Sequence, residues 1–248
     1  MECHQHAEGS KAAQRGLPSY VWRAGQERRF RMVRRWTELG GRRVLDVGSG
    51  LGMYTAAFLR ETEHVFGVEI ERERAVEAQS RAKGMVQAVG ERLPFAEDVF
   101  DIVFSHEVLE HVEDDRACVV EMARVLRPGG RLAIFVPNRL YAFETHGVFW
   151  RGRYHFGNIP LVNWLPTGLR DRLAPHVRAY TTPGLRSLLE GLNLSVVRHT
   201  QIYPGYDNIV ARSPTLGRVL RGLTYALERT IFRAFGLSHF LVAEKGGS

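Results

Sequence analysis

The chain has 248 residues, 44% of them hydrophobic, and a net charge of +7. This length and apolar content suffice for one sizeable core, and no uncharged apolar run is long enough for a transmembrane helix. The N-terminus lacks the apolar stretch of a secretory signal, and two cysteines, Cys3 and Cys118, are too few for a disulfide framework. We therefore expect a soluble, cytoplasmic protein.

The charge is distributed unevenly along the chain. Residues 1–43 and 138–248 carry net charges of +6 and +8, whereas residues 44–137 carry −7. Basic flanks of this kind suit nucleic acid, anionic lipid or an acidic small substrate, and they also occur as ordinary solvated surface. The charge alone leaves these alternatives open.

The first half of the chain alternates between short apolar runs and helical patterns. It begins with a helical leader at 19–37, which has an apolar stripe among arginines. The expected elements that follow are a strand at 43–47, a helix at about 52–61, a strand at 64–70, a helix at 71–83, a strand at 85–89, a strand at 100–105, a helix at 115–126 and a strand at 131–137. Strands that alternate with helices at this spacing predict a mostly parallel sheet covered on both faces.

The pattern changes after Pro137. Residues 138–180 are rich in aromatics, prolines and glycines without a clean period, which favours a lid over the sheet. The expected elements that follow are a helix at 181–192, a strand at 194–203, a basic amphipathic helical stretch at 214–235 and a strand at 238–245.

A glycine-rich turn follows the first strand, in the segment VLDVGSGLGMY at 44–54. Its glycines remove side chains where the backbone approaches a ligand, or only the next helix, closely. The spacing GxGxG is shorter than the GxGxxG of dinucleotide sites, so the turn suits a ligand without phosphate. Glu69 ends the next strand, where a carboxylate can accept hydrogen bonds from both hydroxyls of a ribose.

Five segments resemble, in order and spacing, the class I S-adenosylmethionine (SAM)-dependent methyltransferases: VLDVGSGLG, GVEI, ERLPF, FDIVFSHEVLEHV and RVLRPGGRLAIFVPN. The resemblance covers about residues 40–140 and the C-terminal strand. It implies SAM as the cofactor and an α/β, Rossmann-like fold, with a seven-stranded, mostly parallel sheet and helices on both faces. It also implies a C-terminal antiparallel hairpin, formed here by 194–203 and 238–245.

We expect a single methyltransferase domain over residues 1–248. Its parts are a helical leader (1–42), a cofactor-binding core (43–137), a substrate cap formed by two insertions (138–180 and 204–237) and the end of the sheet (181–203 and 238–245).

The resemblance implies cofactor-binding roles for residues at the strand ends. Asp46 and the glycine turn border the methionine end of SAM, Glu69 binds the ribose, and Ile70 packs on the adenine. Gly90 and Glu91 lie by the adenine edge, and Ser105 ends its strand next to the sulfonium. The implied set is Asp46, Gly48, Ser49, Gly50, Gly52, Glu69, Ile70, Gly90, Glu91 and Ser105. Many relatives have an acid where this chain has Val89, so adenine recognition rests here on backbone or on another side chain.

The segment SHEVLEHVEDD concentrates candidates for removing the acceptor's proton, a step that oxygen and nitrogen acceptors usually need. If 107–111 is helical, Glu107, Glu110 and His111 lie on one face. This ExxEH spacing resembles that of quinone-biosynthesis O-methyltransferases and small-RNA 2′-O-methyltransferases, which use it to bind magnesium. Many other methyltransferases carry the same histidine as a packed structural residue, and we favour that interpretation over a metal site. We predict His111 as the first choice of base and His106 as the second, with no metal ligand.

Two further segments have alternative interpretations. The aromatics and arginines at 143–166 stack on a planar acceptor or, as we favour, form the small core of a helical cap. The amphipathic stretch at 214–235 packs on its own protein, which is the commoner case, or lies on an anionic membrane.

The sequence therefore predicts SAM-dependent methyl transfer to a small molecule, first of all to an oxygen of a lipid-like or quinone-like compound. RNA methylation is the second enzymatic interpretation, and it lacks an evident RNA-binding module. A methyltransferase-like scaffold without turnover is the non-enzymatic alternative. The sequence leaves the oligomeric state open.

Overall fold

The computed structural model describes residues 21–247, so Cys3 and the start of the predicted leader lie outside it. Seven strands form one sheet in the order β10-β11-β5-β4-β1-β2-β3. Their bounds are β1 (Val44–Val47), β2 (Val65–Glu69), β3 (Met85–Gln87), β4 (Phe100–His106), β5 (Leu126–Pro137), β10 (Leu194–Ile202) and β11 (Ser238–Lys245). Strands β1 to β5 pair in parallel, whereas β11 is antiparallel to both β5 and β10. The predicted Rossmann-like sheet with a C-terminal antiparallel hairpin is confirmed.

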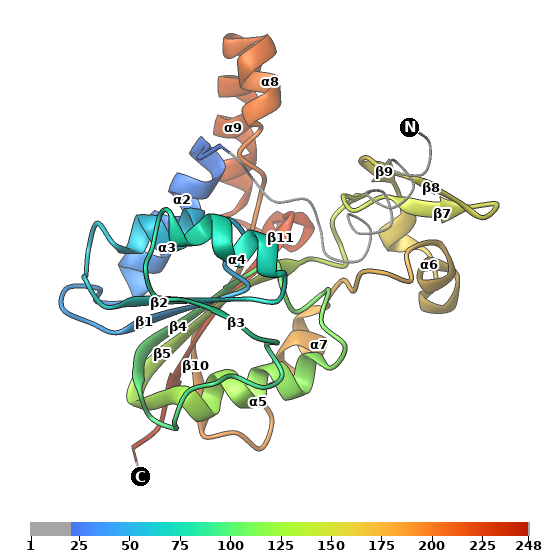
Figure 1. Ribbon diagram of the computed structural model, residues 1–248. Helices are drawn as coiled ribbons and strands as arrows, with labels where there is room; N and C mark the ends of the chain where they lie inside the picture. The colour runs from blue at the N-terminus through green and yellow to red at the C-terminus, as the bar shows by residue number, and fades with distance from the viewer. Residues whose placement is uncertain (1–20, 248) are drawn as a thin grey trace.

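Helices cover both faces of this sheet (Figure 1). The helices are α2 (Ala24–Trp36), α3 (Met53–Phe58) and α4 (Arg72–Gln79) on one face, with α5 (Asp115–Val125) and α7 (Thr182–Ser187) on the other. Strand side chains alternate between two cores: in β4, Val103 joins the core under α5, while Ile102 and Phe104 join the core under α2 and α3. Because both faces of each strand are buried, the central strands are almost continuously apolar.

Two helices are shorter than the sequence pattern predicts. Helix α4 ends at Gln79, where the hydroxyl of Ser80 donates a hydrogen bond of 2.7 Å to the carbonyl of Glu77. Helix α7 ends at Ser187, whose hydroxyl donates at 2.9 Å to the carbonyl of Gly184. Such local side-chain bonds compete with continuation of a helix. Strand β5, by contrast, begins at Leu126, because the predicted turn after α5 joins the sheet through an irregular register.

Residues 138–180 form a cap of two small sheets and short helices. The elements are β6 (Phe143–Glu144), β7 (Val148–Trp150), β8 (Arg153–His155), β9 (Ile159–Pro160), η1 (Val162–Trp164) and α6 (Thr167–Leu173). Strand β6 pairs with β9 and β7 with β8. The prediction that the aromatics form the core of a helical cap is wrong, since Trp150, Phe156 and Trp164 are more than half exposed. Two-stranded sheets offer too few neighbours to bury them.

Residues 204–237 form a second projection, made of α8 (Asp207–Arg212), α9 (Pro214–Leu227) and η2 (Ile231–Phe235). Figure 1 shows α8 and α9 standing out from the sheet beside α2, away from β7 and β8. Arg28 of α2 pairs with Glu228, and the Gly25 amide donates to Asp207 at 3.1 Å. Among residues 21–247, the apolar stripe of α9 is left largely uncovered, because only Gly217 and Thr224 of this helix are buried. No helix in the described part of the chain is long and apolar enough to cross a membrane.

Candidate active site

A cavity of about 1660 Å³ lies where β1, β2 and β4 end. The carboxyl ends of parallel strands are where ligands bind in α/β sheets. The glycine turn and the ends of β2 and β4 form one side of this cavity. The cap, with Thr181 just after it, forms the other side. Of the described residues that line it, none belongs to 204–237, so the assignment of that insertion to the substrate cap stays a prediction. The cavity exceeds the usual volume for one small ligand, about 300–1,000 Å³, and has room for a cofactor and an acceptor.

The three glycines of the turn have left-handed backbones but different surroundings. Gly48 has φ +74°, and a Cβ there would lie 2.2 Å from a methyl group of Val108. Gly52 has φ +76° and packs against Ala78 of α4, with a Cβ contact of 3.1 Å. Gly50, at φ +56°, has nothing within 4 Å of its Cβ position and lines the cavity. Two glycines therefore permit close packing, and the third keeps space open for a ligand.

Glu69, at the end of β2, joins the glycine turn to the cavity wall. Its Oε2 accepts a hydrogen bond of 2.8 Å from the Gly50 amide, and its Oε1 accepts one of 2.9 Å from the Glu71 amide. The side chain is only 5% exposed. Because a carboxylate oxygen has two lone pairs, each oxygen retains an acceptor site. The carboxylate thus holds the turn and fits a ligand with two neighbouring hydroxyls.

Asp46, the residue before the end of β1, lies deep in the same wall and accepts a hydrogen bond of 2.6 Å from the hydroxyl of Thr55. Burial raises the pKa of this carboxyl to about 7, the Thr55 bond opposes the shift, and the nearby charge of Glu69 adds to it. A carboxyl poised in this range ionises readily when a cation binds nearby. The position therefore fits a positively charged ligand group.

Apolar side chains line the wall beyond Glu69. Ile70 and Val89 are 44% and 39% exposed, and both face the cavity. Gly90 lines it too, and its place is set by Cys118 of α5, because a Cβ there would lie 2.6 Å from that sulfur. Glu91 lines the cavity while its Oε1 accepts the Glu113 amide at 2.9 Å. This part of the wall fits a planar ring.

Two members of the predicted cofactor set are not among the lining residues. Gly52 lies against α4, and Ser105 is fully buried inside β4. The residue that reaches the cavity from β4 is His106, whose ring lies 4.8 Å from that of Tyr54 and 5.5 Å from that of Phe135. Burial lowers the pKa of His106 to about 4. Its imidazole is therefore neutral at pH 7.

Residues 107–111 are not helical and form a bend and a turn instead, so the condition for one helix face is not met. Glu107 has φ +55°, a left-handed backbone that cannot belong to an α-helix. Its Oε1 accepts a hydrogen bond of 2.9 Å from the Ser238 hydroxyl, which directs it toward β11. The expected row of Glu107, Glu110 and His111 on one helix face does not form.

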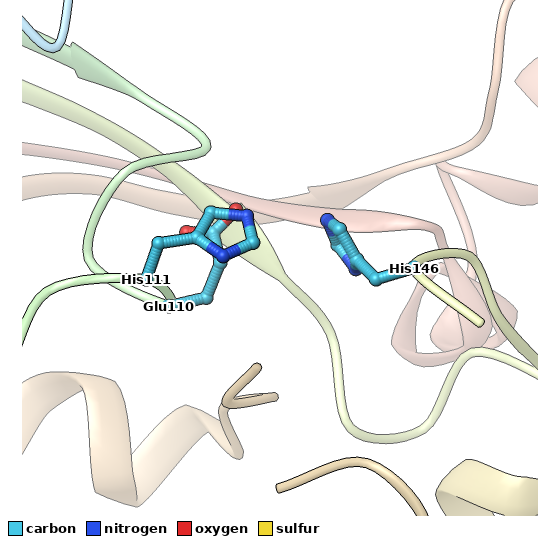
Figure 2. Close-up of side chains that lie close together, drawn as sticks. All are labelled: Glu110, His111 and His146. Atoms are coloured by element: carbon cyan, nitrogen blue, oxygen red, sulfur yellow. The ribbon is translucent and has the colours of Figure 1, made fainter. Parts of the chain in front are cut away.

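The turn instead brings Glu110 and His111 together with His146 of the cap. One ligand atom from each residue lies within 4.8 Å of those of the other two. Glu110 and His111 come from the turn after β4, and the His111 and His146 side chains point toward one another (Figure 2). Sequence reasoning missed His146, since it belongs to no recognisable motif and only the folded cap carries it to the turn.

Two members of this cluster have unusual titration behaviour. Glu110 is 1% exposed, and its carboxyl oxygens have no hydrogen-bond partner among the described residues. Burial and the neighbouring Glu107 raise the pKa of Glu110 well above its usual range. Burial and His146 lower the pKa of His111 to about 3. His111 is therefore neutral at pH 7, and the protonated form of Glu110 is favoured.

A buried ion pair fixes the orientation of His146. Its Nδ1 lies 3.1 Å from Oε1 of Glu144, whose Oε2 accepts a hydrogen bond of 2.8 Å from Arg170. Burial alone would raise the pKa of Glu144, but the bonds from His146 and the charge of Arg170 hold it at about 2. A carboxylate on one imidazole nitrogen leaves the other nitrogen free to face a ligand, as around metal-binding histidines.

Comparison with known proteins agrees with this geometry. Residues 45–134 match a family model described as "Methyltransferase domain". An uncharacterized methyltransferase of Mycobacterium sp. (strain JLS) is 42% identical over 128 residues, 51% of this chain and 47% of that protein. The ubiquinone biosynthesis O-methyltransferase of Xylella fastidiosa (strain M23) is 33% identical over 121 residues, 46% of this chain and 49% of that protein.

A solved structure extends the likeness to most of the chain. The SAM-dependent methyltransferase from Mesorhizobium loti matches with a TM-score of 0.61 at 19% identity, over 90% of this chain and 98% of that one. At this identity the likeness shows the fold, and the chain spans about half the length of the curated relatives it matches. Residues 45–134 thus match the methyltransferase domain family, and the sheet order and glycine turn agree with the fold of SAM-dependent methyltransferases.

Proposed function

We propose that this protein transfers the methyl group of SAM to an oxygen atom of a small, lipid-like or quinone-like acceptor. The observation that carries the proposal is that one cavity joins two sets of groups. The glycine turn and Glu69 lie on one side, and the cluster of Glu110, His111 and His146 lies on the other. The partial likeness to a ubiquinone biosynthesis O-methyltransferase supports this class of acceptor. We place the reaction in the cytoplasm, which the scarcity of cysteines favours.

The residues of the turn fit SAM. Gly50 leaves the space that the cofactor's amino-acid end needs, and the acceptor sites on Glu69 suit a ribose diol. Ile70 and Val89 offer an apolar surface to the adenine, and Asp46 offers a carboxyl to the cationic end. SAM supplies a methyl group on a positively charged sulfur. The chain's own contribution is to align the acceptor with that methyl and to exclude water.

The acceptor hydroxyl must also lose its proton. His111 and His106 are unprotonated at pH 7 and able to accept it, but pKa values of about 3 and 4 make both weak bases. We keep His111 as the first candidate base, since it belongs to the cluster that faces the cap.

A second route to proton loss is favoured by the donor set of the cluster. A buried carboxyl and two imidazoles form a ligand set for a divalent cation such as magnesium. His111 is already in the neutral form that ligation requires, whereas Glu110 would release its proton on binding the cation. Such a cation lowers the pKa of a hydroxyl that it binds.

The first experiment is calorimetric titration of the full chain with SAM and with its demethylated product. We expect binding near the micromolar range, and a loss of about tenfold or more in Glu69→Ala, because charged hydrogen bonds contribute about 1.5–3 kcal/mol each. Glu73→Ala, at an exposed position of α4, is the matched control. A folded wild type that binds neither compound would contradict the proposal and favour a scaffold.

A second experiment tests the reaction itself. Methyl transfer from labelled SAM to hydrophobic phenols and quinols is measured with magnesium and with a chelator. We expect labelled ether products. Transfer to RNA alone would move the assignment to the nucleic-acid alternative. Transfer that is unaffected by the chelator would leave His111 as the base and remove the cation from the proposal.

A further inference from the structure

Helix α9 carries an apolar stripe that no described residue covers. Four aliphatic side chains at helical spacing share one side of the helix and are 36–63% exposed: Leu216, Val219, Leu223 and Leu227. The opposite side of α9 packs on α8, where a Cβ on Gly217 would lie 2.4 Å from Val210. Because a packed amphipathic helix normally buries its stripe, this exposure indicates a contact outside the described residues.

The stripe continues past α9 onto the cap. In η2, Ile231 is 83% exposed and Phe232 is 50% exposed. Phe235, also exposed, lies with its ring 6.3 Å from that of Trp164, which is itself 51% exposed. Trp164 donates from its indole nitrogen to the carbonyl of Leu140, so it stands in a fixed position. We call this set of exposed apolar side chains, from Leu216 through η2 to Trp164, the α9–cap face.

The unpaired charge of the projection that carries this face is positive. Four exposed arginines of the projection form no ion pair with any described residue: Arg212, Arg218, Arg229 and Arg233. Both acidic residues of 204–237 are already paired, Asp207 with Arg221 and Glu228 with Arg28. The charged groups of the projection that remain unpaired among the described residues are therefore all arginines, and a partner would meet positive charge.

From this combination we infer that the α9–cap face docks on an anionic lipid bilayer. An apolar helix side with nearby arginines is the arrangement by which peripheral helices lie in the headgroup region. Exposed Trp164 and Phe232 suit the boundary between acyl chains and headgroups. The inference stands independently of the acceptor proposed above.

Two other occupants fit the face less well. A second copy of the chain would bring Arg229 and Arg233 toward their own counterparts, and like charges across an interface are unfavourable. A nucleic acid would meet the arginines and find stacking planes in Trp164 and Phe232, but it would leave the aliphatic side chains Leu223 and Ile231 uncovered. The bilayer alone uses both the charge and the aliphatic surface.

The test is co-sedimentation of the full chain with vesicles of phosphatidylcholine, with and without phosphatidylglycerol. We expect binding to the anionic vesicles, and weakening as salt rises. Each arginine near an anionic surface contributes about fivefold to the partition, so Arg229→Glu/Arg233→Glu is expected to lower it by at least about 25-fold. Ile231→Ser/Phe232→Ser is expected to lower it severalfold, and both pairs are exposed enough for the protein to stay folded.

The matched control is Arg72→Glu/Val76→Ser, an exposed arginine and an exposed valine on α4, which should leave binding unchanged. Equal binding to neutral and anionic vesicles, or no binding, would overturn the inference. Binding that survives Ile231→Ser/Phe232→Ser would mean adsorption by charge alone and would also overturn it. A dimer in ultracentrifugation that dissociates in Ile231→Ser/Phe232→Ser would assign the face to a second copy.

Discussion

The imidazole ring of His146 lies 5.1 Å from that of His111, with 78° between the ring planes. One ring belongs to the cap and the other to the turn after β4, so the pair joins the lid to the cofactor-binding core (Figure 2). Its partner Glu110 comes from the same turn as His111. We therefore expect the cluster to affect methyl transfer far more than cofactor binding.

The first prediction tests His146 against a histidine of the same cap. His146→Ala removes one member of the cluster and should lower the rate of methyl transfer by about 10–100-fold, with SAM affinity little changed. His155→Ala, at an exposed position of β8, should keep the wild-type rate. The rate and the affinity are measured with labelled SAM and by calorimetry. Equal rates for the two variants would exclude His146 from the reaction.

The second prediction separates the packing glycines from the open one. Gly50→Ala places a side chain in open space at φ +56°, so it should cost about 1–2 kcal/mol of unfolding free energy and reduce SAM affinity about tenfold or more. Gly48→Ala adds a clash with Val108 and should cost about 1–3 kcal/mol more. Urea unfolding and calorimetric titration measure the two effects. Wild-type SAM affinity in Gly50→Ala would separate this glycine from the cofactor site.

The third prediction concerns the pH dependence that Asp46 introduces. Its pKa of about 7 in the folded state lies above the value of 3.8 for a free carboxyl, so the folded state binds more protons between these values. The free energy of unfolding should therefore fall as pH rises from about 4 to about 7, and this slope should be smaller in Asp46→Asn.

The same carboxyl should link cofactor binding to pH. Because the cationic end of SAM favours ionised Asp46, wild-type affinity should rise with pH up to about 7, with release of a proton. Calorimetry in buffers of different ionisation enthalpy measures that proton. Identical pH profiles for wild type and Asp46→Asn would remove Asp46 from the site.

The fourth prediction concerns the buried ion pair behind His146. Glu144 and Arg170 each have side chains only 3% exposed, so Glu144→Gln leaves the buried guanidinium with only the exposed carboxylate of Asp171, at 3.4 Å, as a charge partner. We expect a loss of about 3–5 kcal/mol in the free energy of unfolding, measured with urea. Glu38→Gln breaks the solvent-exposed pair with Arg42 and should cost no more than about 1 kcal/mol. Similar losses of unfolding free energy in the two variants would show that the buried pair stabilises the protein no more than an exposed pair does.

The sequence predicted the core of the fold well. The apolar runs that became β1, β2, β4 and β5 were recognisable because both faces of these strands are buried and their residues are continuously apolar. The glycine turn and Glu69 were recognisable because each directly follows or ends such a strand. These features depend on contacts between neighbours in the chain or between adjacent strands.

The rest of the candidate site depends on contacts between distant segments. Glu107 would share a helix face with Glu110 and His111 if 107–111 were helical, but its left-handed backbone breaks that row, and it lies next to Glu110 through the turn while it accepts a bond from Ser238 of β11. The α9 stripe was expected to be buried, and whether a partner helix covers it is not encoded within the stripe.

The sequence by itself thus determined the sheet, the glycine turn and the strand ends that line the cavity, because short-range periodicity and chain direction specify them. Only the tertiary structure decided that His146 meets His111. That contact requires the cap to fold back over the sheet, and the Glu144–Arg170 pair orients the histidine once it is there. Such packing rests on the summed shape and charge of many residues, and no local pattern in the sequence records it.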